Sequence, residues 1–341
     1  MTYRLITIQQ KKEWMRYVAE SLNHDFYHTW HYHSLVDNGE PFLFVYQEDD
    51  VFIALPLLKR RIEDSDLFDL TSAYGYTGPI SNLDFDSMSD PVMDNFRASF
   101  LSFMHEGQNV CVFARLNPFI NQKRLLERIG GIYENGQTVY IDLTEPIEVQ
   151  RSKYEKRLAR KIRSLRTKNF EIKEANSPDD IRAFTVMYTE NMLRNGASER
   201  YLYNEDYFSQ LLSAPDSNCK LVMVYDNNQA ICGNIVMFAG SIIRNHLSAT
   251  ATSHVHESPS KLIIDEISLL GRALGISYYH LGGGLGGRSD SLFQFKAAFS
   301  NLILEDTTWR FVADTVSYEE LVNARAVDKS AGFFPVYRST F

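Results

Sequence analysis

The order of strand-like and helix-like stretches most constrains the fold of this chain, because a mixed α/β order runs through it twice. Apolar strand patterns alternate with amphipathic helices in the first half, and the same mixture starts again in the second half. A length of 341 residues is also more than a single core commonly covers. We therefore predict an α/β fold with mixed sheets and two domains, residues 1–148 and 149–341.

Each half contains at least one hairpin and several helices. In the first half we predict helices at 13–22, 91–106 and 122–129, and strands at 41–47, 51–58, 67–71, 109–115 and 138–143. In the second half we predict a basic helix at 151–168, helices at 178–193, 205–214 and 260–274, and strands at 170–175, 221–225, 229–238, 242–250 and 276–281.

Composition and termini favour a cytoplasmic protein. No apolar run approaches the roughly 20 residues that a membrane helix needs, so we expect no transmembrane segment. The first residues lack the apolar core of a signal peptide. The three cysteines, Cys111, Cys219 and Cys232, are scattered among apolar residues, which is typical of buried thiols and not of a disulfide framework.

One segment is sharply basic although the net charge of the chain is −8. Nine basic residues and a single acid, Glu155, lie between Arg151 and Lys168, so the remaining chain carries −16. Leu158, Ile162 and Leu165 form one stripe of this segment, which predicts a helix packed on one side. Its basic face could contact phosphates of RNA or of an anionic lipid-linked substrate, or it could simply be solvated.

Four stretches resemble the FemABX acyltransferases, whose two halves each have the GNAT fold. The order of helices, hairpin, strand, helix and parallel strand in the second half is similar to that of the GNAT core. The four resembling stretches are Tyr74–Pro79 (YGYTGP), Lys156–Lys168, Tyr278–Ser300 with its glycines and Phe-Lys-x-x-Phe element, and Phe333–Arg338 (FFPVYR). The resemblance implies two tandem GNAT-like domains and the transfer of an acyl group to an amine.

Lys296 and Phe295 are the catalytic candidates that the resemblance implies, as the pair that contacts the acyl-donor end. An ester donor is already reactive, so the protein must mainly align two substrates and stabilise the developing oxyanion. The Lys296 ammonium suits that electrostatic role if it lies near the glycines. The alternative is a surface lysine whose stem packs beside core phenylalanines.

The glycine run from Gly282 to Gly287 matches a nucleotide-binding pattern, G-x-G-x-x-G, after a strand and before a helix. Only about 60 residues follow it, too few for the rest of a dinucleotide-binding sheet. We expect instead that Gly283 and Gly284 let the backbone approach a substrate, with Arg288 beside them. A flexible turn is the simpler alternative.

The resemblance implies aminoacyl-tRNA as the co-substrate and no resident cofactor, with tRNA meeting the basic helix. Acyl-CoA is the alternative donor. The stretch from Ser253 to Ser260, where a CoA-binding GNAT domain has a glycine-rich turn, contains no glycine. That absence favours a donor other than CoA, although the amides of a helix start could still hold a phosphate.

The acceptor side also rests on resemblance. Tyr74 and Tyr76 match aromatic positions of the family's Gly-Pro loop, and Asp84 is the acid that follows that loop. Arg194 and Tyr201 resemble residues that hold acceptor phosphates. The implied acceptor is an amine on an anionic cell-envelope precursor, such as a peptidoglycan peptide or an amino-sugar glycan.

A cluster of histidines, at positions 24, 28, 31 and 33, raises the question of a metal. Their spacings cannot all converge from one helix face, and no cysteine or glutamate joins them, so we predict no metal site. Three functions stay open at this stage: an aminoacyltransferase, an acyl-CoA or acyl-carrier-protein-dependent N-acyltransferase, and a degenerate GNAT pair that only binds a glycan or RNA.

Overall fold

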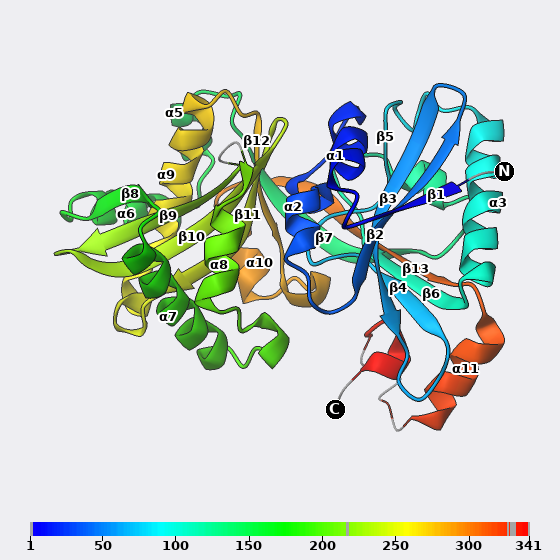
Figure 1. Cartoon of the computed structure of the whole chain (residues 1–341). Helices are drawn as coiled ribbons and strands as arrows, with labels where there is room; N and C mark the ends of the chain where they lie inside the picture. The colour runs from blue at the N-terminus through cyan, green and yellow to red at the C-terminus, as the bar shows by residue number, and fades with distance from the viewer. Residues whose placement is uncertain (1–2, 216–217, 326, 328–331, 340–341) are drawn as a thin grey trace. The chain divides into compact units, whose positions relative to one another are not determined.

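The computed structural model describes residues 3–215, 218–325, 327 and 332–339, and it divides the chain into two compact units (Figure 1). Unit 1 comprises residues 1–135 and 305–341, and unit 2 comprises residues 136–304. This division differs from the predicted domains 1–148 and 149–341 at both ends, because the last part of the chain returns to the first unit.

Unit 1 is built on a mixed sheet in the order β1-β2-β3-β4-β6-β13. All neighbouring strands are antiparallel except β4 and β6, which are parallel. Its strands are β1 (Tyr3–Thr7), β2 (Glu40–Glu48), β3 (Val51–Arg61), β4 (Phe68–Thr71), β6 (Asn109–Arg115) and β13 (Leu302–Val312), with the short β5 (Ile80–Ser81) paired to β3. Its helices are α1 (Lys11–Glu20), α2 (Trp30–Ser34), α3 (Asp90–Glu106), α4 (Lys123–Leu126) and α11 (Thr315–Ala324).

Unit 2 is built on a second mixed sheet in the order β8-β9-β10-β11-β12-β7. Here the parallel pair is β11 and β12. Its strands are β7 (Ile132–Asp142), β8 (Glu171–Ala175), β9 (Cys219–Asp226), β10 (Gln229–Ala239), β11 (Ile242–Thr250) and β12 (Tyr278–Gly283). Its helices are α5 (Ile147–Ser152), α6 (Lys156–Arg166), α7 (Pro178–Arg194), α8 (Glu205–Leu212), α9 (Ser260–Ala273) and α10 (Ser291–Ala297).

The two sheets repeat one topology, and each receives its sixth strand from an unexpected part of the chain. In each unit, four strands that are consecutive in the sheet pair antiparallel, and the fourth also pairs in parallel with a fifth strand. A helix connects the two parallel strands along the chain, α3 in unit 1 and α9 in unit 2. The antiparallel partner of β12 is β7, which precedes the basic segment, whereas the partner of β6 is β13, which follows α10. We did not predict β13 or α11, and their return to unit 1 explains why the predicted boundaries differ from the observed ones.

Helices cover both faces of the unit 2 sheet. Apolar residues of α6 and α9 pack on one face, around Ile243, Tyr279 and Leu281. On the other face lies α7 (Figure 1). The Phe184 ring of α7 lies so close to Gly233 of β10 that a Cβ added to Gly233 would meet it at 2.6 Å. Successive side chains of β10 therefore point to two faces that are both buried, as in any sheet covered on both sides.

The basic segment is not the single helix 151–168 that we predicted. It forms α5 and then α6, separated by a turn in which the amide of Glu155 donates to Ala298 O at 3.0 Å. The predicted apolar stripe is correct, because Leu158, Ile162 and Leu165 are all buried. The helix predicted at 122–129 is also much shorter, covering only Lys123–Leu126.

Both ends of the basic segment bind one buried carboxylate. Asp265, in the middle of α9, is fully buried and accepts hydrogen bonds from Arg151 Nη2 at 2.7 Å, Tyr154 Oη at 2.9 Å and Arg166 Nη2 at 2.5 Å. Burial alone would raise the pKa of Asp265, but these hydrogen bonds outweigh it and hold the pKa below its usual value. This network fastens α5 and α6 to the core of unit 2.

A pH dependence of stability follows from Asp265. Because its pKa is lower in the folded than in the unfolded chain, its charge stabilises unit 2 above the unfolded pKa of about 3.9, and this contribution is lost as the pH falls through the folded value. We expect Asp265→Asn to lower the free energy of unfolding at pH 7 and to flatten its decline below about pH 4. Urea unfolding at several pH values measures both effects, and an unchanged acid decline would contradict this account.

Among the described residues, no helix combines the length and the apolar character that crossing a bilayer requires.

Candidate functional site

The parallel strands of unit 2 separate soon after they begin to pair. Their register runs only from Ile242–Tyr278 to Arg244–His280. Beyond that point β11 continues along β10 with a bulge at His246, and β12 continues along β7 with a bulge at Leu281. Because a bulge bends its strand, the two bulges turn β11 and β12 away from each other. We call the region between Asn245–Thr250 and Leu281–Gly283 the strand split.

Unit 1 has no such opening at the equivalent place in its described residues. There β4 and β6 pair in parallel, and the chain after β4 stays bound to β6: Ser72 N donates to Phe113 O at 2.8 Å and Thr77 N to Arg115 O at 2.8 Å. The Gly-Pro loop thus occupies the edge that is open in unit 2. The strand split therefore belongs to unit 2, where β11 and β12 stop pairing after Arg244 and His280.

Glycines line one arm of the strand split because no side chain fits there. A Cβ on Gly283 would meet Gln137 O at 2.6 Å, and a Cβ on Gly284 would meet Arg288 O at 1.9 Å. Gly286 adopts a left-handed φ of 61° within a short 3-10 turn. These glycines allow the backbone to turn closely against β7. The sheet around them is mainly antiparallel, so it does not support the dinucleotide-binding alternative.

Lys296, on α10, lies beside the end of β12, near the glycines where we expected its ammonium. Its Nζ donates to Gly283 O at 2.6 Å, so the structure brings Lys296, Gly283 and Gly284 together. Phe295, half-buried, packs edge-to-face on Phe299 at 5.6 Å between ring centroids and joins the apolar core. The Lys296 ammonium thus lies beside the glycine arm, while Phe295 fixes the helix that carries it.

Asp290 and Arg288 shape the loop between the glycines and α10. The carboxylate of Asp290 accepts from Phe293 N at 2.9 Å, capping α10, and from Leu285 N at 3.0 Å. Those backbone hydrogen bonds lower the pKa of Asp290. Arg288 is exposed, and its Nε donates to Leu285 O at 3.1 Å. Asp290 was not among the predicted site residues, although an aspartate just before a short helix is a recognisable capping signal.

The Gly-Pro loop of unit 1 is held by buried side chains. Gln122 Nε2 donates to Thr77 O at 2.8 Å and to Pro79 O at 2.9 Å, and His28 Nε2 lies 3.2 Å from Gly78 O. Tyr32 Oη donates to the carbonyl of Tyr74 at 2.8 Å. The loop is therefore rigid. It presents the 45% exposed ring of Tyr74, whereas Tyr76 is 9% exposed with the Arg115 guanidinium 5.5 Å from its centroid.

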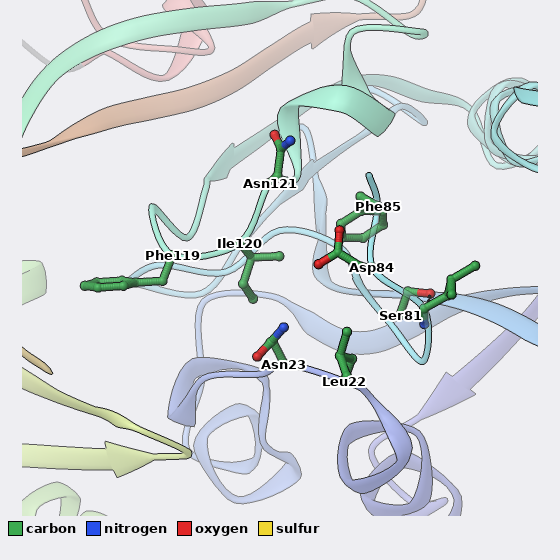
Figure 2. Close-up of a pocket in the computed structure, with 9 residues that line it drawn as sticks. Leu22, Asn23, Ser81, Asp84, Phe85, Phe119, Ile120 and Asn121 are labelled. Atoms are coloured by element: carbon green, nitrogen blue, oxygen red, sulfur yellow. Dashed lines mark hydrogen bonds between the residues drawn. The ribbon is translucent and has the colours of Figure 1, made fainter. Parts of the chain in front are cut away.

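Asp84 lies beside a small hollow of about 40 Å³, where it is accompanied by Asn23 and Asn121 (Figure 2). This volume holds only a few water molecules. The Asp84 carboxylate accepts from Asp86 N at 2.8 Å, and it is exposed. Asn82 stands at the position after the Gly-Pro loop where the FemABX family often has an acid. Its Oδ1 accepts from Phe52 N at 2.9 Å, and its Nδ2 donates to Asp50 O at 2.7 Å, so it binds the start of β3.

Arg194 and Tyr201 lie in unit 2, at the end of α7 and in the 3-10 turn Glu199–Tyr201. Arg194 donates to Thr252 Oγ1 at 2.8 Å and to Asn191 Oδ1 at 2.6 Å. It therefore ties α7 to the segment that connects β11 with α9. This connection is the one that a phosphate-bearing donor would approach if it entered the strand split.

Two of the four clustered histidines, His28 and His33, are buried inside unit 1. His28 is fully buried and accepts from Asp25 N at 2.9 Å through Nδ1, and burial lowers its pKa to about 3. His33 is likewise buried, with its pKa lowered to about 4 for the same reason. Within the described ranges no three histidine, cysteine or acidic side chains come close enough to hold a metal. The cysteines are buried thiols in the residues described.

The outer side of α6 carries a row of unneutralised charge. Lys156, Arg157, Arg160, Lys161 and Arg163 point away from the buried stripe, and all but the half-buried Lys161 are exposed. In the part of the chain that the structure describes, none of the five forms an ion pair. The four other basic residues of the segment do, with Glu145, Glu257, Asp265 or Glu266. We call the five the basic face.

Comparison with protein families identifies a domain in the second half. Residues 152–296 match the model of an acetyltransferase (GNAT) domain. No curated protein sequence matches the chain significantly.

Solved structures share the fold of the whole chain. FemX has a TM-score of 0.71 at 12% identity, over 94% of this chain and 99% of its own. L-PGS from Bacillus licheniformis has a TM-score of 0.55 at 10% identity, over 89% and 92% of the two chains. A tandem GNAT protein from the clavulanic acid biosynthesis pathway has a TM-score of 0.51 at 9% identity, over 92% and 99%.

Two predictions are confirmed by these likenesses. The chain has the predicted α/β fold of two tandem GNAT-like units, which it shares with FemX and a tandem GNAT protein, and its residues 152–296 match a GNAT domain, as the predicted likeness to FemABX-type acyltransferases requires. Its GNAT domain makes it an acyltransferase, so the prediction of an enzyme is confirmed as well.

Proposed function

We propose that this acyltransferase moves an aminoacyl group from aminoacyl-tRNA onto an amine of an anionic cell-envelope precursor, with the strand split of unit 2 as the donor site. The observation that carries the proposal is the coincidence of the strand split, the glycine arm and Lys296 within the matched GNAT domain. An extended acyl donor would pair with β11 along the edge that no longer pairs with β12 after Arg244. Its reactive carbonyl would then lie near the positive charge of Lys296.

The basic face supports RNA as the donor's carrier. Five cationic side chains along an 11-residue helix, about 16 Å long, can neutralise several phosphates. The segment from Thr252 to Glu257 forms a 3-10 helix without glycine before α9 begins. A glycine-rich pyrophosphate turn is therefore replaced there by side chains, which suits CoA less well.

The acceptor assignment rests on unit 1 and on resemblance. The rigid Gly-Pro loop presents Tyr74, and aromatic rings of this kind pack well against sugar or peptide groups. The resemblance to the FemABX acyltransferases implies an acceptor at the cell envelope, and FemX shares the fold of this chain. We further expect the protein to act in the cytoplasm, where aminoacyl-tRNA is present.

Labelled donors provide the direct test of the proposal. The purified protein is incubated with tRNA carrying a labelled amino acid, or with labelled acetyl-CoA, together with peptidoglycan-precursor peptides that contain a free amine. Transfer of label from tRNA to the amine supports the proposal. Transfer from acetyl-CoA alone would replace it with the second candidate, and no transfer from either donor would favour a binding module.

Reversing the charge of the basic face gives a sharper prediction. We expect Arg157→Glu/Arg160→Glu/Arg163→Glu to weaken tRNA binding by at least about tenfold near 0.1 M salt, and to reduce the slope of binding against salt, because three phosphate contacts are lost. Filter binding across a salt series measures both quantities. A matched control is Lys173→Glu/Arg182→Glu, since both residues lie outside the basic face and already form ion pairs. Equal losses in the two variants would contradict a specific role for the basic face.

An acyl-CoA-dependent N-acyltransferase is the second candidate function. One observation favours it: residues 152–296 match the model of an acetyltransferase (GNAT) domain. The labelled acetyl-CoA arm of the experiment decides between the two donors.

A further inference from the structure

A group of hydrogen-bonded polar side chains, two buried, one half-buried and one exposed, lies at the vertex of the strand split. Asn245 is the first residue of β11 after its pairing with β12 ends. Around it lie Asn234 of β10, Ser248 of β11 and Tyr279 of β12, of which Asn234 and Tyr279 are fully buried. Polar groups at such depth need hydrogen-bond partners, and these four bind one another.

Their hydrogen bonds orient the amide of Asn245. Its Oδ1 accepts from Asn234 Nδ2 at 2.6 Å and from Tyr279 Oη at 2.7 Å. Asn234 is held in turn by Ser248 Oγ, which donates to its Oδ1 at 2.7 Å. The oxygen of the Asn245 amide therefore has two donors in the core, and the amide nitrogen points the other way.

The nitrogen of that amide has donor capacity left. Asn245 is half-buried, whereas Asn234 and Tyr279 are fully buried and Ser248 is exposed. Its Nδ2 carries two protons, and it makes one long, weak hydrogen bond, to Ser248 Oγ at 3.5 Å. A donor held rigidly by two strong hydrogen bonds, at the point where two strands part, is suited to bind a carbonyl oxygen.

We propose that Asn245 binds the carbonyl oxygen of the acyl donor in the strand split, an inference that rests on the proposed donor site. When the acceptor amine attacks, a C–N bond forms, and the carbonyl oxygen gains negative charge that Asn245 Nδ2 stabilises. The C–O bond of an ester, or the C–S bond of a thioester, then breaks. The proton lost by the amine ends on the leaving oxygen or sulfur, so that the step balances. Asn234 and Tyr279 are positioning residues that act through Asn245.

Nuclear magnetic resonance tests this binding without turnover. The side-chain amide signals of Asn245 are assigned by their loss in Asn245→Asp. The probes are acetyl-CoA and an acceptor-stem RNA whose amino acid is joined by a stable amide in place of the ester. We expect one probe to shift these signals in the wild-type protein. If neither probe shifts them, the inference is overturned whatever the activity of the protein.

Kinetics test the contribution to the reaction. Asn245→Asp keeps the shape of the side chain and removes the donor, so we expect kcat to fall by about 10²–10³-fold with little change in the KM for the donor. Asn245→Ala should show the same loss of kcat together with a lower unfolding temperature, because it leaves the buried Asn234 Nδ2 and Tyr279 Oη without their acceptor, and Tyr279→Phe should show a smaller loss of kcat. Full kcat in Asn245→Asp would overturn the inference.

A surface control and a separate outcome complete the design. Asn228→Asp makes the same chemical change at an exposed turn residue and should leave both readouts unchanged. A wild-type protein whose Asn245 signals respond to a probe, but which transfers neither acyl group to an amine, would refute the proposed function while the carbonyl-binding site stands.

Discussion

Replacing Lys296 with methionine is expected to lower kcat by about 100-fold or more while the fold survives. Methionine keeps most of the apolar stem that packs beside Phe295, but it removes the charge and the hydrogen bond to Gly283 O. The lost hydrogen bond costs about 1 kcal/mol of stability, which lowers the unfolding temperature by only a few degrees. Arg288, which also lies near the glycine arm, is exposed and donates to Leu285 O, so it does not replace the charge lost beside Gly283, and the activity should fall far more than the stability. Single-turnover transfer from the identified donor, beside calorimetry, measures the two effects.

The control for Lys296 is a lysine at the far edge of the same sheet. Lys173 lies on β8, which β9, β10 and β11 separate from β12, and Lys173→Met should leave kcat unchanged. Lys296→Arg retains the charge and should keep more activity than Lys296→Met, although its guanidinium cannot occupy the place of an ammonium. Full activity of Lys296→Met would remove Lys296 from the catalytic assignment. A collapse of both activity and unfolding temperature would indicate a purely structural role.

Much of the fold was predictable because it depends on local patterns. The hairpin of β9 and β10 is encoded by the turn Asp226-Asn227-Asn228, whose two asparagines adopt the left-handed region. The buried stripe of α6 follows directly from helical periodicity. The proximity of Lys296 to the glycine arm also depends on a short stretch of chain, so sequence reasoning could anticipate it.

The exchange of sixth strands was not predictable from local patterns. Both β7 and β13 are ordinary strands in sequence, and nothing in them records that β7 pairs with β12 and β13 with β6. The same limit applies to the vertex of the strand split. Asn234, Asn245 and Tyr279 lie on three strands, and asparagine is common in turns, so neither composition nor spacing distinguishes them.

The break in the basic segment has a similar cause. Glu155 and the residues before it have no strong helix-breaking character, and the periodic pattern alone extends through them. The helix ends because Asp265 binds Arg151 and Tyr154 on one side of the break and Arg166 on the other. The structure also divides the nine basic residues into four that form ion pairs and the five of the basic face, which form none with the described residues.

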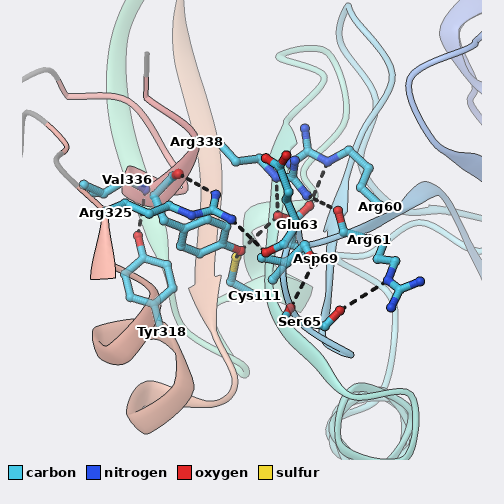
Figure 3. Close-up of polar contacts among 12 residues, drawn as sticks. Arg60, Arg61, Glu63, Ser65, Asp69, Cys111, Tyr318, Arg325, Val336 and Arg338 are labelled. Atoms are coloured by element: carbon cyan, nitrogen blue, oxygen red, sulfur yellow. Dashed lines mark hydrogen bonds and ion pairs between the residues drawn. The ribbon is translucent and has the colours of Figure 1, made fainter. Parts of the chain in front are cut away.

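The largest loss of stability is expected from Asp69, the buried carboxylate that anchors the end of the chain in unit 1. Asp69 lies on β4 and is fully buried. It accepts from Arg60 Nε at 2.7 Å, Tyr337 Oη at 2.9 Å and Arg338 Nε at 2.5 Å (Figure 3). Removing one partner of a buried ionic group costs about 3–5 kcal/mol, since the remaining charges stay uncompensated. We expect Asp69→Ala to lower the free energy of unfolding of unit 1 by about 3 kcal/mol, near the lower limit, because both arginines are partly exposed and can regain water.

Equilibrium unfolding in urea, with hydrogen exchange at residues 332–339, measures this loss and shows where it acts. Asp66→Ala breaks an exposed ion pair with Arg61 and should cause no measurable change, which separates burial from charge. Tyr337→Phe removes one hydrogen bond to Asp69 and should cost about 1 kcal/mol. If Asp69→Ala costs no more than Tyr337→Phe, the arginines do not depend on the carboxylate.

A large loss in Asp69→Ala, with faster exchange at residues 332–339, would mean that the FFPVYR stretch anchors the chain end that follows β13 and α11. That stretch was recognised by resemblance, and its contacts with Asp69 explain why the last part of the chain belongs to unit 1.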